Sequence, residues 1–413
     1  MKPIASCVLA ILILALHAPG GLAEDNEAAS PVDAVTAGKL LLNLRARYEQ
    51  VEQDGKAYDA NALTLRTLLG WQTGTYRGFS AMAQLINVGR ANENYNDTTN
   101  RKTQFPVVAD PDDTDINQIY LDYTGLPDTT LRLGKQSIKL DNVRFVGNVE
   151  FRQVMQVFTG ATVENRSLPG IALYGGHLER LKTIFGDQQE IRLDILHGAW
   201  EWTPGNRLIG YGYFDDSPKT ASVTGFADNS NRIAGLRADG AYPVGDKLKL
   251  LYTAEYARQN HYADGNARID AGYFHGGAGL GWDSFFGRLD YELLGSNGGA
   301  YAFQTPLATN HLFQGWADLF LTTPAQGIRD TYLTAGGTIA AAKLTAEYHD
   351  FKSDFGSIHY GREFDFGVTY PLRKGLNGKI EYASFREADI LAPASARKRD
   401  TDKLWLTLVY NFE

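Results

Sequence analysis

The sequence predicts an all-β protein: a single transmembrane antiparallel β-barrel of about 18 strands, of the Gram-negative outer-membrane type. Three observations support this fold. Residues 403–412 alternate apolar and polar side chains with a period of two and end on an aromatic residue, Phe412. Many earlier segments alternate in the same way. The chain has no stretch of about eighteen apolar residues that could form a membrane helix.

The N-terminus is typical of a secretory signal peptide. Lys2 precedes the apolar run 8–16, which is too short to cross a bilayer, and Gly21 and Ala23 offer the small residues that a signal peptidase recognises. We therefore expect removal of residues 1–23 and a barrel formed by residues 24–413; a short buried helix is the alternative. The only cysteine, Cys7, would leave with the signal, so the mature chain has no thiol nucleophile or ligand.

Eighteen segments alternate, and a closed antiparallel bacterial barrel requires an even number of strands. For residues 403–412 alone, an edge strand of a soluble sandwich is the alternative. The predicted strands are residues 39–52, 61–73, 77–90, 116–124, 129–138, 150–164, 169–181, 188–200, 205–215, 230–242, 246–260, 267–283, 285–296, 329–340, 342–353, 360–371, 376–388 and 402–412.

The connections between these segments alternate in length, as hairpins in a barrel should. Tight turns rich in Pro, Gly and Asp lie, for example, at 125–128 and 203–205. The long polar connections, predicted as extracellular loops, are residues 91–115, 215–229, 297–328 and 389–401. The acids and amides of the first loop leave calcium binding open, but the loop lacks the spaced acidic pattern of an EF-hand, so we expect a solvated loop.

Charged strand faces should line the lumen, because a charge facing lipid at mid-bilayer costs a few kcal/mol. The arginines predicted to point inward are Arg45, Arg47, Arg66, Arg132, Arg152, Arg192 and Arg237. The acids predicted to point inward are mainly in the last third: Asp290, Glu292, Glu347, Glu363 and Asp365. A structural ion pair is the alternative for any single arginine. An arginine wall facing an acidic wall predicts an aqueous channel that prefers anionic or polar solutes.

Four motifs stand out along the chain: the longest is residues 302–324, AFQTPLATNHLFQGWADLFLTTP, and the others lie in 134–153, 348–351 and 361–365. These motifs resemble those of the alginate-export family of outer-membrane porins. The resemblance covers essentially the mature chain. It implies an 18-stranded outer-membrane barrel that passes an anionic polysaccharide through an arginine-rich pore. The motif positions that it implies to be functional are Lys135, Gln136, Arg144, Arg152, Glu363 and Asp365.

Departures from the family pattern leave the substrate open. Lys135 stands where an arginine is usual, and its parity places it above the membrane rim; the turn at 371–375 is short; and Glu413 follows the terminal Phe412. One hypothesis is a pore for an alginate-like polysaccharide or oligouronate. The other is a passive uptake porin for small anions or carbon sources.

The connection 302–324 is expected to be a constriction. Loops longer than about fifteen residues are usually functional, and this one would expose a large apolar surface if it lay free in water. It is predicted to fold onto the barrel mouth or into the lumen, with Asp318 capping or pairing and a short helical turn at 316–320. The aromatic residues expected to narrow the pore are Phe303, Phe313, Trp316 and Phe320.

Little in the sequence indicates catalysis. It has no HExxH and no GxSxG motif, and the glycines of 276–281 are expected in a strand, so we expect no enzyme, with an outer-membrane hydrolase as the rival. His349, beside Glu347, is expected to be a hydrogen-bonded luminal histidine, and no metal or cofactor is expected. The net charge of −8 excludes a basic nucleic-acid footprint. The expected partners are outer-membrane lipid and lipopolysaccharide, the anionic solute, and the assembly machinery through strand Leu404–Phe412, with a monomeric barrel.

Overall fold

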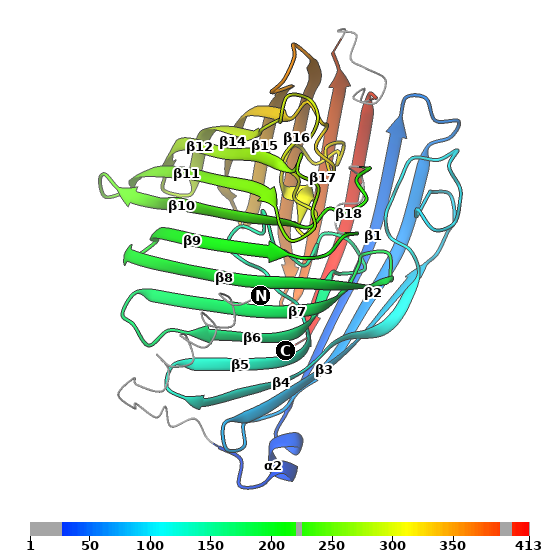
Figure 1. Cartoon of the computed structure of the whole chain (residues 1–413). Helices are drawn as coiled ribbons and strands as arrows, with labels where there is room; N and C mark the ends of the chain where they lie inside the picture. Colours follow the sequence, from blue (N-terminus) through cyan, green and yellow to red (C-terminus); the bar gives the residue numbers. More distant parts are fainter. Residues whose placement is uncertain (1–26, 220–224, 389–398, 413) are drawn as a thin grey trace.

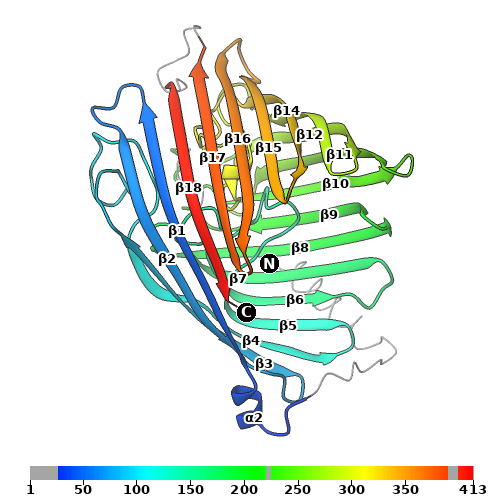
Figure 2. The ribbon, with the colours of Figure 1, turned by 180° about the vertical axis from the view of Figure 1, so that it is seen from behind.

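The computed structural model describes residues 27–219, 225–388 and 399–412. Eighteen antiparallel strands form one sheet that closes where β1 pairs with β18 (Figures 1 and 2). The strands are β1 Lys39–Gln53, β2 Ala60–Gln72, β3 Phe79–Arg90, β4 Asp113–Leu126, β5 Thr129–Gln136, β6 Val157–Asn165, β7 Ile171–Lys182, β8 Gln188–Thr203, β9 Asn206–Asp215, β10 Asn231–Pro243, β11 Leu248–His261, β12 Asp270–Trp282, β13 Phe285–Leu294, β14 Ile328–Ile339, β15 Ala342–Lys352, β16 His359–Arg373, β17 Leu376–Glu387 and β18 Thr401–Phe412. The predicted barrel is confirmed. The predicted signal peptide 1–23 and most of the predicted loop 389–401 lie outside the described residues.

Every predicted strand has a counterpart in the structure, but the predicted start of the sixth strand is wrong. Strand β5 ends at Gln136 and β6 begins only at Val157, so residues 150–156, predicted as the start of a strand, belong to a loop. Val154 and Met155 are buried because this loop lies inside the barrel. Such apolar residues are also typical of a strand, which explains the wrong prediction. Loop 137–156 therefore joins the long connections.

The two ends of the barrel differ. Short connections such as 127–128, 204–205 and 340–341 lie at one end, which we call the short-turn end. The helix α2, Pro31–Thr36, docks there: Ser30 caps its N-terminus, and the Trp71 Nε1 donates to the Val35 carbonyl at 3.0 Å. In the described part of the chain, no helix is long and apolar enough to cross a membrane.

The outer face of the sheet is apolar, as the alternation predicted. In β18, Leu406 and Leu408 are exposed, whereas Lys403, Trp405 and Thr407 are buried on the inner face. The same alternation holds in β2, where the exposed residues include Leu63, Leu65 and Leu69. This leucine-rich outer face suits contact with lipid.

The largest hydrophobic cluster lies inside the barrel. Phe145, from loop 137–156, packs against Tyr211 at 5.3 Å, Tyr273 at 5.2 Å and Phe303 at 5.8 Å between ring centroids. Phe303 itself belongs to the connection 295–327, whose yellow segment runs within the barrel in Figure 1. The two loops thus form a shared core with the inner faces of the strands.

Candidate functional site

Loop 137–156 is held by the inner face of β1. Arg45 donates from Nη1 to the Glu150 carbonyl at 2.7 Å, from Nε to the Gln153 side chain at 2.8 Å, and from Nη2 to the Arg152 carbonyl. Arg47 donates to the Phe151 carbonyl at 2.6 Å, and its guanidinium lies 4.3 Å from the centre of the Phe151 ring. We call the inner faces of β1 and β2 the basic wall. Two of its arginines, Arg45 and Arg47, thus satisfy carbonyl groups of the loop in the barrel interior.

Loop 295–327 is held by the opposite kind of contact. The Ala317 amide donates to Glu363 Oε1 at 2.6 Å, and the Trp316 amide to Asp365 Oδ2 at 3.4 Å. Gly315 precedes them with a φ of 81°, and a Cβ at this position would collide with the Glu363 carboxylate. We call the inner faces of β13 to β16 the acidic wall. Its carboxylates accept from amides of the loop, at a point that only glycine lets the backbone approach.

Two arginines of loop 137–156 connect it to loop 295–327 and to the walls. Arg144 forms an ion pair with Glu292 at 2.7 Å, and both side chains are 1% exposed. Its Nη2 donates to Gln314 at 2.9 Å, and Phe313 lies 4.5 Å from the guanidinium. Because both charges are buried, loss of either partner would leave an uncompensated charge inside the barrel.

Arg152 makes the second connection. It pairs with Asp318 at 2.7 Å and with Glu49 at 3.2 Å, and Lys403 lies 3.4 Å from the same Asp318 carboxylate. Burial alone would raise the pKa of Asp318, but His311, Lys403 and Arg152 hold it well below its usual range. Burial alone would lower the pKa of Arg152, but Glu49 and Asp318 raise it above its usual range. The pair is therefore fully charged at neutral pH.

Arg66, on β2, has a different environment. Its side chain is 3% exposed, its Nη2 donates to Asn43 at 2.9 Å, and its Nε and Nη1 have no hydrogen-bond partner. Among the described residues, no carboxylate forms an ion pair with it. The Nε and Nη1 atoms of Arg66 are therefore buried donors for which the described residues supply no acceptor.

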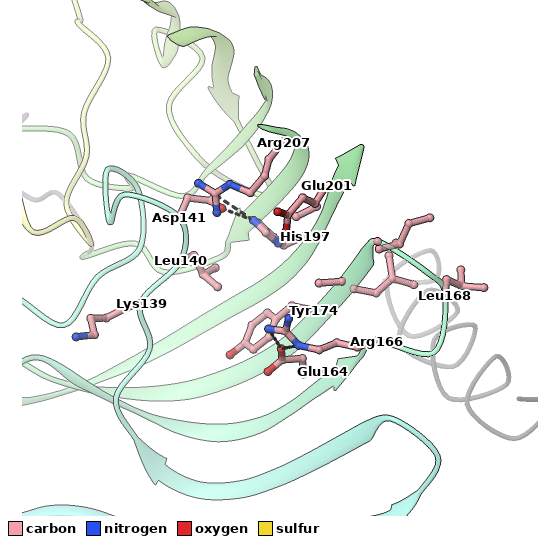
Figure 3. Close-up of a pocket in the computed structure, with 15 residues that line it drawn as sticks. Lys139, Leu140, Asp141, Glu164, Arg166, Leu168, Tyr174, His197, Glu201 and Arg207 are labelled. Atoms are coloured by element: carbon pink, nitrogen blue, oxygen red, sulfur yellow. Dashed lines mark hydrogen bonds and ion pairs between the residues drawn. The ribbon is translucent and has the colours of Figure 1, made fainter. Parts of the chain in front are cut away.

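Of the cavities that adjoin these loops, two are the larger ones. One, of about 230 Å³, is lined by Phe313 and Gln314 of loop 295–327 and by charged groups that include Arg237, Arg288 and Glu347. The other, of about 500 Å³, lies between Lys139–Asp141 and the turn 166–170 toward the short-turn end (Figure 3). Its labelled side chains include the pairs His197–Asp141, at 2.9 Å, and Arg166–Glu164.

The chain matches the family model described as alginate export over residues 40–288. The protein belongs to the alginate export family. It is an outer-membrane channel and not an enzyme.

Solved structures agree with this assignment in fold. The barrel is similar to OccK9 (OpdG) of Pseudomonas aeruginosa, with a TM-score of 0.70, 15% identity and coverage of 92% of this chain and 99% of that one. It is similar to OccAB3 of Acinetobacter baumannii, with a TM-score of 0.70, 14% identity and coverage of 92% and 100%. It is also similar to Pseudomonas aeruginosa OpdK solved with vanillate, with a TM-score of 0.69, 15% identity and coverage of 92% and 99%. No curated protein sequence matches the chain.

In this alginate export family barrel, most of the sequence-predicted charges lie on inner faces. Arg132 pairs with Asp122 at 2.7 Å, and Arg237 pairs with Asp239 at 2.7 Å and with Glu255 at 2.8 Å. The acids Asp290, Glu292, Glu363 and Asp365 are buried, and Glu347 is partly buried. Arg152 lies on a loop and not on a strand.

Arg192 is the exception, because its predicted inward orientation is wrong. Its side chain is exposed and pairs with Asp216 at 3.0 Å, while its neighbours Ile191 and Leu193 are buried. The parity of β8 was misassigned because its inner face is apolar: Ile191, Leu193 and Ile195 belong to the hydrophobic cluster that contains Phe145. An inner face that packs on a loop loses the polar character expected of a lumen.

The aromatic residues predicted to form the constriction do line the inward loop. Phe303 and Phe320 are buried, and Phe320 packs against Phe351 at 4.7 Å and Tyr360 at 5.6 Å. Phe313 and Trp316 are half-buried. The predicted helical turn at 316–320 is wrong: the helical turn is a 3₁₀ segment, Asn310–Leu312.

Other predicted residues have structural contacts. Lys135 lies near the end of β5 next to loop 137–156, paired with Asp115 at 2.8 Å, and Gln136 is buried and accepts from Thr162 at 3.1 Å. In the first long loop, Asp97 pairs with Arg90 at 2.9 Å. The sequence reasoning missed Asp330, although Tyr332 and Thr334 share its strand face and could have revealed it. Monomeric state and contact with the assembly machinery stay predictions.

Proposed function

We propose that this channel passes small anionic solutes, carboxylates of about the size of one sugar or aromatic ring, in preference to cations. The observation that carries the proposal is Arg66, a buried guanidinium in the basic wall whose Nε and Nη1 atoms lack an acceptor. A carboxylate can accept a charge-assisted hydrogen bond from either of these nitrogen atoms. Arg45 and Arg47 lie on the adjacent strand and add to the positive potential.

The size limit is inferred from the two loops in the lumen. They share a hydrophobic core with the wall and leave cavities of about 500 and 230 Å³ beside them. Cavities in this range accommodate small molecules. OpdK, a barrel of similar fold, was solved with vanillate, which is a small aromatic carboxylate. This supports small carboxylates as the class to test first.

The family match favours a second candidate, passage of an alginate-like polysaccharide or oligouronate. A chain of uronate units would need loops 137–156 and 295–327 to leave the lumen. That movement would break the buried Arg144–Glu292 pair, at a cost of about 3–5 kcal/mol if either charge stays unpaired. We therefore place the polymer second.

The experiment measures reversal potentials of the mature channel in planar bilayers across a salt gradient. We expect anion preference in the wild type and its reduction in Arg66→Gln, most clearly at low ionic strength, where screening is weakest. Arg192→Gln is the matched control, because Arg192 is exposed and distant in sequence from the basic wall. Cation preference in the wild type, or an unchanged potential in Arg66→Gln, would contradict the proposal.

Liposome swelling separates the two candidate solutes. We expect a monouronate and a small aromatic carboxylate to enter at similar rates and a long oligouronate to be excluded. Entry of the long oligouronate at the rate of the monomer would favour the polysaccharide pore instead.

A further inference from the structure

The acidic wall contains a cluster that the anion proposal does not use. Glu347 and His349 lie on β15, and Asp365 lies opposite on β16, where Glu347 pairs with Asp365 in the strand register. One ligand atom from each of the three lies within 4.8 Å of the other two. Asp330, on β14, flanks the histidine.

The orientation of the His349 ring is fixed by Asp330. Its Nδ1 lies 2.9 and 3.1 Å from the two Asp330 carboxylate oxygens, so Nδ1 donates to Asp330. The Nε2 atom then faces Glu347 Oε2 at 3.4 Å and Asp365 Oδ2 at 3.6 Å. A histidine held by a carboxylate on one nitrogen, with the other nitrogen directed at the ligand site, is the usual arrangement of a metal-binding histidine.

In the described structure, His349 is the only side chain in an ion pair with these carboxylates that could carry a positive charge. Asp365 Oδ1 and Glu363 Oε2 are buried and have no hydrogen-bond partner, and the two side chains are 0% and 1% exposed. Among the described residues, no lysine or arginine forms an ion pair with Asp330, Glu347, Glu363 or Asp365. Buried carboxylates without a cation are costly, since desolvation disfavours each charge.

We propose that Glu347, His349 and Asp365 bind one divalent transition-metal cation of the Zn²⁺ class, with Asp330 as the positioning residue. Tetrahedral zinc with bonds of about 2.0–2.2 Å separates its ligand atoms by roughly 3.3–3.6 Å. The gaps of 3.4 and 3.6 Å from Nε2 to the carboxylates fit this geometry. A mixed nitrogen and oxygen set favours zinc, copper or nickel over calcium and magnesium, which take oxygen ligands.

The cavity beside the cluster gives a cation access to the site, and the contact of Asp365 with loop 295–327 suggests what binding would change. Glu347 is 18% exposed and, with His349, lines the cavity of about 230 Å³, so a hydrated ion can approach from there. Asp365 also accepts from the Trp316 amide of loop 295–327. A bound cation would reduce the negative charge of the acidic wall directly beside the loop. This inference does not depend on the solute that the channel passes.

The experiment titrates Zn²⁺, and separately Co²⁺, into the untagged mature chain in detergent, after a heat-modifiable gel shift has shown a folded barrel. His349→Gln is the test variant. His275→Gln is the matched control, because His275 is also buried in an inner face but its Nε2 contacts a single carboxylate, Asp290, at 2.9 Å. If His349→Gln fails to fold, Glu347→Gln replaces it, since Glu347 is partly exposed.

We expect the wild type and His275→Gln to bind one Zn²⁺ at least about tenfold more tightly than His349→Gln, with four-coordinate Co²⁺ absorption in the first two alone. Asp330→Asn should retain binding with an affinity about 10–100-fold lower. Excess Ca²⁺ should not compete. Equal Zn²⁺ affinity in the wild type and His349→Gln, or no binding by the wild type, would overturn the proposal and leave protons as the neutralising charge.

Discussion

The basic and acidic walls face the same lumen but hold their loops by opposite means. Arg45 and Arg47 donate to backbone carbonyls of loop 137–156, whereas Glu363 and Asp365 accept from backbone amides of loop 295–327. Each wall therefore satisfies the backbone groups of opposite polarity in the loop that it holds. Arg45 with Arg47, and Glu363 with Asp365, can lie side by side because these charges have partners in the peptide backbone, which has both donors and acceptors.

The walls also differ in which buried polar atoms have no hydrogen-bond partner. On the basic wall, the Nε and Nη1 atoms of Arg66 have no hydrogen-bond partner, and on the acidic wall the Glu363 Oε2 and Asp365 Oδ1 atoms have none. We propose that the first binds an anion in transit and the second a resident cation. The variants below separate side chains that hold a loop from those that only supply charge.

The largest effect is expected for Arg144→Met. It leaves Glu292 buried without its partner, which costs about 3–5 kcal/mol, and removes the contact with Gln314. We expect single-channel conductance to rise several-fold in a barrel that still inserts. Arg192→Met, whose partner Asp216 is partly exposed, is the control and should conduct like the wild type. Equal conductance in the two variants would place Arg144 outside the constriction.

A smaller rise in conductance is expected for Arg47→Met. The substitution removes one hydrogen bond to the Phe151 carbonyl, and a bond of this charged type contributes about 1.5–3 kcal/mol. Arg66→Met is the comparison on the same wall, because Arg66 makes no hydrogen bond to either loop. We expect Arg66→Met to change ion preference and Arg47→Met to change conductance; the reverse pattern would show that the two roles are misassigned.

The outer face of the strands could be predicted from the sequence more reliably than the inner face. The outer face meets lipid, a uniform solvent, so the leucines of β2 and β18 alternate cleanly and predicted both the strands and the barrel. The inner face of some strands contacts water, whereas that of others packs against a loop, so it has no uniform pattern of polar residues. In β8 it is Ile191, Leu193 and Ile195, and Arg192 was consequently assigned to the wrong face.

The two loops show the same limit. The length and aromatic content of loop 295–327 predicted an inward constriction, and its fold into the lumen agrees. Only residues 139–149 of loop 137–156 were predicted as a connection, because apolar residues such as Val154 and Met155 gave 150–156 the composition of a strand. The pairs Arg144–Glu292 and Arg152–Asp318 join segments more than a hundred residues apart, and no local pattern indicates such partners.

The smallest effect concerns pH. The pKa of Asp318 is lower in the folded channel than in the unfolded chain, so its stabilising contribution is complete above the unfolded value of about 4 and is lost as the pH falls toward the folded value. We expect conductance to be constant from pH 8 to about 5 and to rise only below about pH 4. Asp318→Asn should conduct more at every pH, while Asp216→Asn serves as the control. A rise near pH 6 in the wild type would implicate a histidine instead.

The central claim is that loops 137–156 and 295–327, packed together in the lumen, set the size of the pore. Deletion of residues 305–322 removes the side chains that contact Arg144 and Arg152 from loop 295–327 and leaves the strands intact. The most direct measurement is the single-channel conductance of this variant beside the wild type, in the same bilayer and salt. We predict a several-fold higher conductance with entry of larger sugars. An unchanged conductance in a barrel that inserts normally would contradict the account.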